Sequence, residues 1–141
     1  MRAIIFIIVL LAAGVAAGAG PDDVLGKYWT PKKDGQLVVY REGDQYFGRL
    51  VSFNVTGQLD EKNPDEALRS RPIVGVNLLA DFRYDEDKAR WSEGSIYDAK
   101  SGKTYKCHLW FEDDNTGELW ARGFIGLSLF GRTERFMRVS D

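Results

Sequence analysis

The chain is poor in the groups that carry most enzyme chemistry near neutral pH, because its 141 residues include one cysteine and one histidine. The two are neighbours, Cys107 and His108, in a stretch from 103 to 111 that alternates as a β-strand does. Successive strand side chains point to opposite faces of a sheet, so these two groups cannot act together on one atom. The pattern argues against a catalytic pair and favours binding over catalysis.

A single cysteine also excludes an intrachain disulfide, so packing alone must stabilise the fold. We expect Cys107 to be a small buried residue, and a disulfide between two copies is the alternative. Acidic clusters at 81–87 and 112–114 lack the ordered oxygens, central glycine and final Glu of a calcium loop, so we predict no metal and no cofactor. Ser128 lacks the Gly-x-Ser-x-Gly elbow of a hydrolase nucleophile. A hydrolase that uses paired carboxylates is a distant third function.

The chain has no excess of basic residues, since 19 Lys and Arg face 21 Asp and Glu for a net charge of −2. We therefore expect no nucleic-acid partner and no binding to anionic membranes. Long apolar runs are missing too, because the run from Ala3 to Leu11 is shorter than the roughly 20 residues of a membrane span.

That run follows Arg2 and precedes Ala17-Gly18-Ala19, a pattern typical of a signal peptide cleaved after Ala19. No cysteine lies near this point to carry a lipid, so we do not expect a lipoprotein. The predictions are a signal peptide over 1–19, a single domain over 20–141, and a periplasmic or secreted protein with no integral membrane span.

Strand patterns fill the remaining chain, at 25–30, 36–41, 45–55, 73–84, 90–97, 103–112, 118–125 and 132–139. Short polar turns join most of them, and the connection at 56–71 is the exception in length. It contains a brief helix pattern over 63–69, with Asn63 as N-cap and Pro64 as the first helical residue. One short helix cannot cover an open sheet. We predict an all-β fold, an antiparallel up-and-down barrel of about eight strands with one short helix.

The side chains on the two faces of the predicted strands differ in size more than in polarity. The smaller apolar rows fit the interior of a barrel: Tyr105, Cys107, Leu109 and Phe111, then Leu119, Ala121, Gly123 and Ile125. The opposite rows carry Trp110, Trp120 and Phe124, more aromatic area than a solvated face usually shows. Either those rings cover a second contact surface, or the inward assignment is reversed.

Several segments together resemble a known family: DVLGKYWT at 23–30, RPIVG at 71–75, GSIYD at 94–98, SGKTYKC at 101–107, and RGFIGLSLFGRT at 122–133. They resemble the small exported bacterial proteins of the DUF2147 domain family, over nearly all of the chain that follows the leader. The resemblance implies a lipocalin-like (calycin-type) antiparallel barrel and an exported protein. It implies no particular chemistry, because the family has no settled function.

The start of the domain is also similar to the Gly-x-Trp start of lipocalins, with Gly26 and Trp29 separated by one residue more. In that group a basic residue of the last strand stacks over the Trp, and the resemblance gives this role to Arg138. A guanidinium over an indole contributes about 0.5–2 kcal/mol. We expect Gly26, Trp29 and Arg138 to be structural residues at the closed end of the barrel rather than ligand contacts.

These observations predict a non-catalytic periplasmic protein that binds a small apolar or amphipathic molecule inside the barrel. Its candidate contacts are aromatic rings for the walls and arginines for a carboxylate or phosphate: Tyr105, Trp110, Arg122, Phe124 and Arg132. Tyr105 and Trp110 lie on opposite faces of one strand, so at most one of them lines the cavity. The apolar connection at 126–131 is predicted to plug the barrel, with a lid as the alternative.

A second function stays open, in which the barrel is packed solid and acts as an interaction module of the bacterial envelope. Trp110, Trp120 and Phe124 would then contact a second copy of the chain, as a homodimer, or an envelope protein. The interior volume separates the two hypotheses, because a ligand-binding barrel should show an enclosed void of about 300 Å³ or more and a solid barrel should not.

Overall fold

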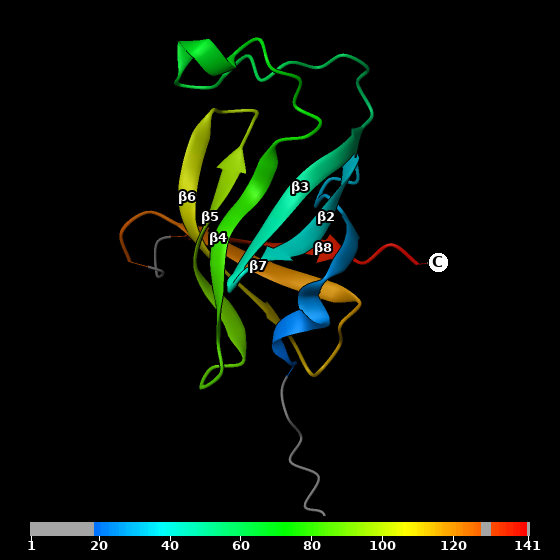
Figure 1. The fold of residues 1–141 in the computed structure, drawn as a ribbon, viewed down its shortest axis with the longest axis vertical. Coiled ribbons are helices and arrows are strands. Elements are labelled where there is room, and N and C mark those ends of the chain that lie inside the picture. Colours follow the sequence, from blue (N-terminus) through cyan, green and yellow to red (C-terminus); the bar gives the residue numbers. More distant parts are fainter. Residues whose placement is uncertain (1–18, 128–130, 141) are drawn as a thin grey trace, which may run out of the picture.

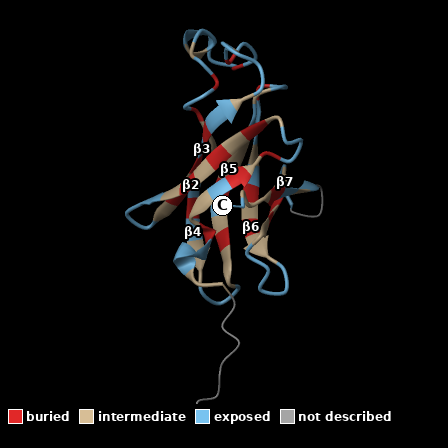
Figure 2. Cartoon of the chain, turned by 90° about the vertical axis from the view of Figure 1, so that its right-hand side faces the viewer, coloured by how far each residue is buried: buried red, intermediate tan, exposed pale blue. Residues whose placement is uncertain are grey.

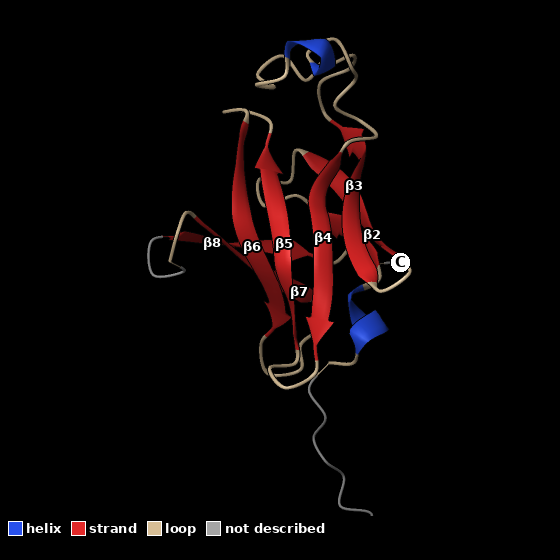
Figure 3. Ribbon diagram, turned by 60° about the vertical axis from the view of Figure 1, so that its left-hand side comes forward, coloured by secondary structure: helices blue, strands red, loops and turns tan. Residues whose placement is uncertain are grey.

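In the computed structural model, which describes residues 19–127 and 131–140, eight strands form one antiparallel sheet in which each strand pairs with the next. The strands are β1 (Gly26–Trp29), β2 (Gly35–Glu42), β3 (Gln45–Phe53), β4 (Asn77–Asp85), β5 (Arg90–Asp98), β6 (Lys103–Phe111), β7 (Glu118–Phe124) and β8 (Gly131–Met137). The sheet curls until β7 and β8 cross behind β4, β5 and β6 (Figures 1 and 3). Residues 1–18 of the predicted signal peptide and the centre of the 126–131 connection, with Ser128, lie outside the described residues.

The first and last strands meet, which brings the two edges of the sheet together. Tyr28 of β1 forms a bridge with Arg138, directly after β8, and the Val139 N–H donates to the Lys27 carbonyl at 2.9 Å. Meeting edges leave few unpaired strand groups and hide one face of every strand. The predicted all-β up-and-down barrel is confirmed.

The two ends of the barrel differ. A 3₁₀ helix, η1 (Pro21–Val24), lies at one end, and the long connection between β3 and β4 lies at the other with its own 3₁₀ helix, η2 (Glu66–Leu68) (Figures 1 and 3). Neither helix is long and apolar enough to cross a membrane, and the described residues contain no other helix.

The interior near η1 is packed solid by large side chains from all around the barrel. Figure 2 shows buried positions recurring along the strands, and the largest of them are Trp91, Tyr28, Tyr46, Phe82, Leu37, Leu109 and Leu119. The Trp91 Nε1–H donates to the Pro21 carbonyl at 3.0 Å, and the Tyr46 hydroxyl donates to the Asp22 carboxylate at 2.9 Å. These bonds fix η1 across the closed end.

The inward assignment holds within the strands but is wrong for Ile125, which follows the end of β7 and is 68% exposed. Cys107 and Leu109 are 2% and 1% exposed in the core, and burial raises the pKa of the Cys107 thiol to about 12. His108 lies on the outer face, where its ring is 5.4 Å from that of Trp110 and 5.7 Å from that of Phe124. Cysteine and histidine are on opposite sides of the barrel wall.

The helical predictions need correction. The sequence predicted one short helix and did not predict η1, because the four residues of η1 are too few to show a helical period. In the long connection the N-cap is Asp65, whose carboxylate accepts the Ala67 N–H at 3.0 Å. Asn63 does not cap a helix, because its side chain instead accepts the Asp65 N–H and donates to Asp60.

The fourth strand begins at Asn77, four residues later than predicted. Ile73 and Val76 pack with Leu50 in a small second core, and the Val76 carbonyl accepts the Leu50 N–H at 2.9 Å just before β4 begins. The Ile73 N–H donates to the Gln58 carbonyl within the connection, at 2.9 Å.

Candidate ligand cavity

A cavity of about 1290 Å³ occupies the half of the barrel opposite η1. Its mouth lies among the connections that follow β1, β3, β5 and β7, which an up-and-down barrel places at one end. Binding pockets for drug-sized molecules measure about 300–1000 Å³, so this space takes such a molecule. This end of the barrel is therefore hollow, and the hollow opens to solvent at its mouth.

The walls of the cavity are mainly apolar. Leu50 and Ile73 of the second core face it, with Leu78, Ile96, Ala121 and Phe136. Tyr105 adds a phenol to this wall, and no hydrogen-bond partner for its hydroxyl occurs among the residues that the structure describes. A ligand in the cavity would meet hydrocarbon on most sides and one phenol able to donate or accept a hydrogen bond.

The rim of the cavity is charged, with both signs present. Lys100 lies 3.4 Å from the Asp34 carboxylate, and Arg132 lies 3.3 Å from Glu134. Lys32, Lys62, Glu61 and Asp98 also line the rim. The arrangement of apolar depth and polar mouth fits an amphipathic guest.

The connection between β3 and β4, residues 54–76, covers part of the mouth. Gln58, Leu59, Glu61 and Lys62 belong to the cavity lining, and Figure 1 shows the connection running above the strands. It packs tightly on the turn between β5 and β6, because a Cβ added to Gly102 would lie 1.8 Å from the Lys62 carbonyl oxygen. We call residues 54–76 the cover.

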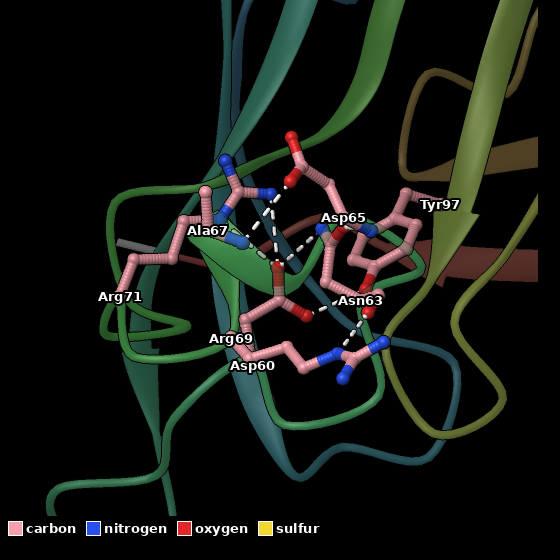
Figure 4. Close-up of polar contacts among 7 residues, drawn as sticks. All are labelled: Asp60, Asn63, Asp65, Ala67, Arg69, Arg71 and Tyr97. Carbon is pink, nitrogen blue, oxygen red and sulfur yellow. Dashed lines mark hydrogen bonds and ion pairs between the residues drawn. The ribbon is translucent and has the colours of Figure 1, made fainter.

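A buried carboxylate holds the cover in place (Figure 4). Asp60 is 1% exposed, and Arg71 contacts its Oδ2 through both Nε and Nη2, each at 2.9 Å. Asn63 donates to the same oxygen at 2.9 Å, and Tyr97 of β5 donates to Oδ1 at 2.5 Å. Arg69 donates to the Asn63 carbonyl at 2.7 Å. The bond from Tyr97 ties the cover to the barrel wall.

The protonation states of this cluster follow from its contacts. Burial raises the pKa of Asp60, but the hydrogen bonds from Tyr97 and Asn63 and the ion pair with Arg71 together outweigh it, so the pKa lies below its ordinary value. Burial and the bond to the Asp60 carboxylate raise the pKa of Tyr97 to about 12. The cluster is therefore an ionised carboxylate with neutral phenol and cationic guanidinium around neutral pH.

The closed end contains the residues compared above with lipocalins, with one correction. Arg138 stacks over the ring of Tyr28, at 4.7 Å, and not over Trp29. Strand alternation explains this, because Gly26 and Tyr28 are two residues apart and share the inner face. Gly26 has φ of +142°, and a Cβ there would lie 2.5 Å from Arg138 Nη1.

The structure separates the candidate contacts into two groups. Tyr105 and Arg132 belong to the cavity lining, whereas Phe124 borders the cavity at the end of β7 with its ring on the outer face, 5.7 Å from that of His108. Trp110 and Arg122 do not, because they lie on the outer face: Trp110 stacks on Trp120 at 6.2 Å, and Arg122 donates to Thr133 at 2.8 Å. The alternation of β6 and β7 that turns Tyr105 and Ala121 inward turns these two outward.

Sequence reasoning missed the residues that hold the cover. Asp60, Asn63, Arg71 and Tyr97 meet across 37 residues of sequence separation, and no spacing rule links them. The one available signal was an acid in a connection too long to be a simple turn. Within residues 19–127 and 131–140, no three His, Cys, Asp or Glu residues are grouped so as to hold a metal ion.

Comparisons with known proteins agree with this geometry. The family model described as "Uncharacterized protein conserved in bacteria (DUF2147)" matches residues 26–138. A solved structure described as protein HP1028 from the human pathogen Helicobacter pylori, belonging to the lipocalin family, is similar with a TM-score of 0.72. It is 22% identical, and the match covers 84% of each chain. No curated protein matches the chain.

The closed base, the Arg138–Tyr28 stack and the order of the strands define a lipocalin-like β-barrel fold. The chain belongs to the DUF2147 family.

Proposed function

We propose that this protein binds a small apolar or amphipathic molecule in the barrel cavity and releases it unchanged. The observation that carries the proposal is the cavity of about 1290 Å³, apolar in its depth and charged at its rim. Tyr105 supplies the hydrogen bond that orients the guest, and the cover, which Asp60 holds in place, shields the guest from water. Burial of the apolar part provides most of the affinity.

The absence of catalysis is part of this proposal. The Cys107 thiol is buried with a pKa of about 12, so it is neither ionised nor accessible as a nucleophile. His108 lies outside the barrel, on the far side of the wall from the cavity. Among the described residues, the histidine and cysteine therefore offer no acid–base pair to a molecule in the cavity.

We also propose that the protein acts in the periplasm or outside the cell, after removal of residues 1–19. The leader pattern supports this, since it ends at Ala19, two residues before η1 begins at Pro21. Native mass spectrometry of the protein purified from the periplasm measures both the N-terminus and any guest that copurifies.

The binding test uses N-phenyl-1-naphthylamine, a neutral probe whose fluorescence rises in apolar surroundings. We expect Ile96→Trp, which fills the cavity, to weaken probe binding at least about tenfold, because it removes the space for the ring system. Val51→Trp adds the same bulk at an exposed position of β3 and should leave binding unchanged.

A milder variant keeps the test valid if Ile96→Trp does not fold. Tyr105→Phe keeps the wall and removes one hydroxyl, so we expect dodecanoate to displace the probe about threefold to tenfold less well. The proposal fails if no guest copurifies and probe binding is the same in the parent protein, Ile96→Trp and Val51→Trp.

A further inference from the structure

A second hollow lies outside the barrel wall, at the end that holds η1. Its volume is about 500 Å³, and it lies between the turn joining β4 to β5, strand β6, and the connection that follows β6. Lys88, Arg90 and His108 line it, together with Trp110, Phe111 and Asp114. Ala19 and Ala89 complete the lining, and the proposed removal of residues 1–19 takes Ala19 alone from it. Figure 1 shows the turn between β4 and β5 at the η1 end, opposite the connection between β3 and β4. We call this hollow the outer pocket.

Cations dominate the surroundings of the outer pocket. Burial lowers the pKa of His108, and the charges of Arg90, Arg122 and Lys88 lower it further. Arg122 lies directly across from His108 in the sheet register. Asp114 is the one acid in the lining of this pocket, so the field at the imidazole is positive.

The pocket also has a rigid aromatic wall. The Trp110 ring stacks on Trp120 with an interplanar angle of 21°, and its Nε1–H donates to Glu112 at 3.2 Å. Arg135 caps the far side of Trp120 at 5.1 Å. These contacts hold the Trp110 indole in one orientation, so a flat ring can stack there at low entropic cost. The Arg90 guanidinium is held as well, since its Nε–H donates to Ser92 Oγ at 3.2 Å.

We propose that the outer pocket is a second binding site, for a carboxylate carried on a flat or apolar-faced ring. The ring would lie against Trp110, and the carboxylate would meet Arg90 and Lys88 beside His108. Guanidinium groups match the geometry of carboxylates, and hydrogen bonds between charged partners are the strong ones. Aromatic acids and acidic sugars share this chemistry.

The outer pocket and the barrel cavity can be tested separately. They share no lining residue, and the mouth of the cavity lies at the end of the barrel that holds residues 54–76. Loss of one site leaves the other intact. The inference therefore does not depend on the function proposed for the cavity.

The single histidine provides the measurement, because its imidazole protons give isolated NMR signals. We expect benzoate or glucuronate to raise the pKa of His108 by about half a unit, since a bound carboxylate offsets the cations around it. Benzamide and glucose, the neutral matches, should leave it unchanged. A response to benzoate alone identifies the guest as an aromatic acid, and a response to glucuronate identifies an acidic sugar.

Variants locate the site. Arg90→Gln and Lys88→Gln should each weaken benzoate binding about tenfold, because each removes a cation from the pocket. Lys103→Gln, an exposed change at the other end of β6, is the matched control, and Ile96→Trp in the cavity should also have no effect. The proposal is overturned if neither acid moves the His108 titration, if the neutral matches move it equally, or if Arg90→Gln binds as the parent does.

Discussion

Asp60 shows how much one residue can decide in a connection that has little regular structure. Its carboxylate is buried and contacts Arg71, Asn63 and Tyr97, which belong to the cover and to β5. A buried ion pair adds little net stability compared with apolar residues, but removal of one partner leaves the other unpaired. The contribution of Asp60 is therefore measured by the stability that the protein loses when Asp60 is replaced.

We expect Asp60→Asn to lower the free energy of unfolding by about 2–3 kcal/mol, somewhat less than a fully buried pair because the Arg71 side chain is partly exposed. Urea denaturation measures this. Asp44→Asn is the matched control, since Asp44 pairs with Arg83 at the surface and should cost less than about 0.5 kcal/mol. Equal costs for the two variants would contradict the assigned role.

The same cluster makes the stability depend on pH at both extremes. The pKa of Asp60 is lower in the folded state than its ordinary value of 3.8, so its stabilisation is present above that value and is lost as pH falls through the lowered pKa. The pKa of Tyr97 is raised from 10.0 to about 12, so that contribution is present below pH 10.0 and is lost as pH rises towards 12.

We therefore expect the stability difference between the parent protein and Asp60→Asn to be largest between about pH 4 and pH 10 and to shrink on either side. Urea denaturation at about pH 3, 7 and 11 tests this. A difference that grows in acid would show that Asp60 is not ionised in the folded protein.

At the scale of elements, the cover is positioned by close packing as well as by charge. Gly102, in the turn between β5 and β6, has φ of +74° and lies against the Lys62 backbone. Gly57, within the cover, has φ of +72° and nothing within 4 Å of the position of a Cβ. The two glycines thus share a left-handed backbone conformation, which would strain any other residue, and they differ in packing.

We expect Gly57→Ala to cost about 1 kcal/mol, from the left-handed conformation alone. Gly102→Ala should cost more and should speed the release of N-phenyl-1-naphthylamine, because the methyl group pushes the cover from the turn. Stopped-flow release of the probe checks the second effect. Similar release rates for the two variants would mean that the cover does not retain the guest.

The strands were predictable because their alternation and the turns between them are local properties of the chain. The N-cap was not, since Asn63, Pro64 and Asp65 all suit a helix start by type, and only the contact with Asp60 withdraws Asn63 from that role. The late start of β4 has a similar cause, because Ile73 is buried by Leu50 and not by strand pairing.

For the whole molecule, closure of the barrel depends on the contacts of Arg138. Its guanidinium stacks on Tyr28 and donates to the carbonyls of Leu25, Asp23 and Thr116, at 2.9, 2.6 and 2.8 Å. One side chain thus joins the last strand, the first strand and the segment that leads from η1.

We expect Arg138→Lys to lower the free energy of unfolding by about 2 kcal/mol, because an ammonium group cannot make these bonds in a planar fork. Arg49→Lys is the control, since Arg49 stacks on Tyr40 at 4.7 Å at the surface and should cost less than about 0.5 kcal/mol. Thermal and urea unfolding measure both. If Arg138→Lys lowers the free energy of unfolding no more than Arg49→Lys does, closure of the barrel does not depend on the Arg138 guanidinium.

The sequence by itself determined the class of the fold, the number of strands and which residues share a face, because side-chain alternation and turn chemistry act between near neighbours. Which of the two faces points inward was left to the structure. The sequence also separated Cys107 from His108, which one strand places on opposite sides of the wall. The tertiary structure decided what the barrel contains. Whether Phe136, Ala121 and Ile96 fill the interior or leave a cavity depends on how strands distant in sequence face one another. The ties from Asp60 to Tyr97 and from Arg138 to Tyr28 likewise exist only once the sheet has curled.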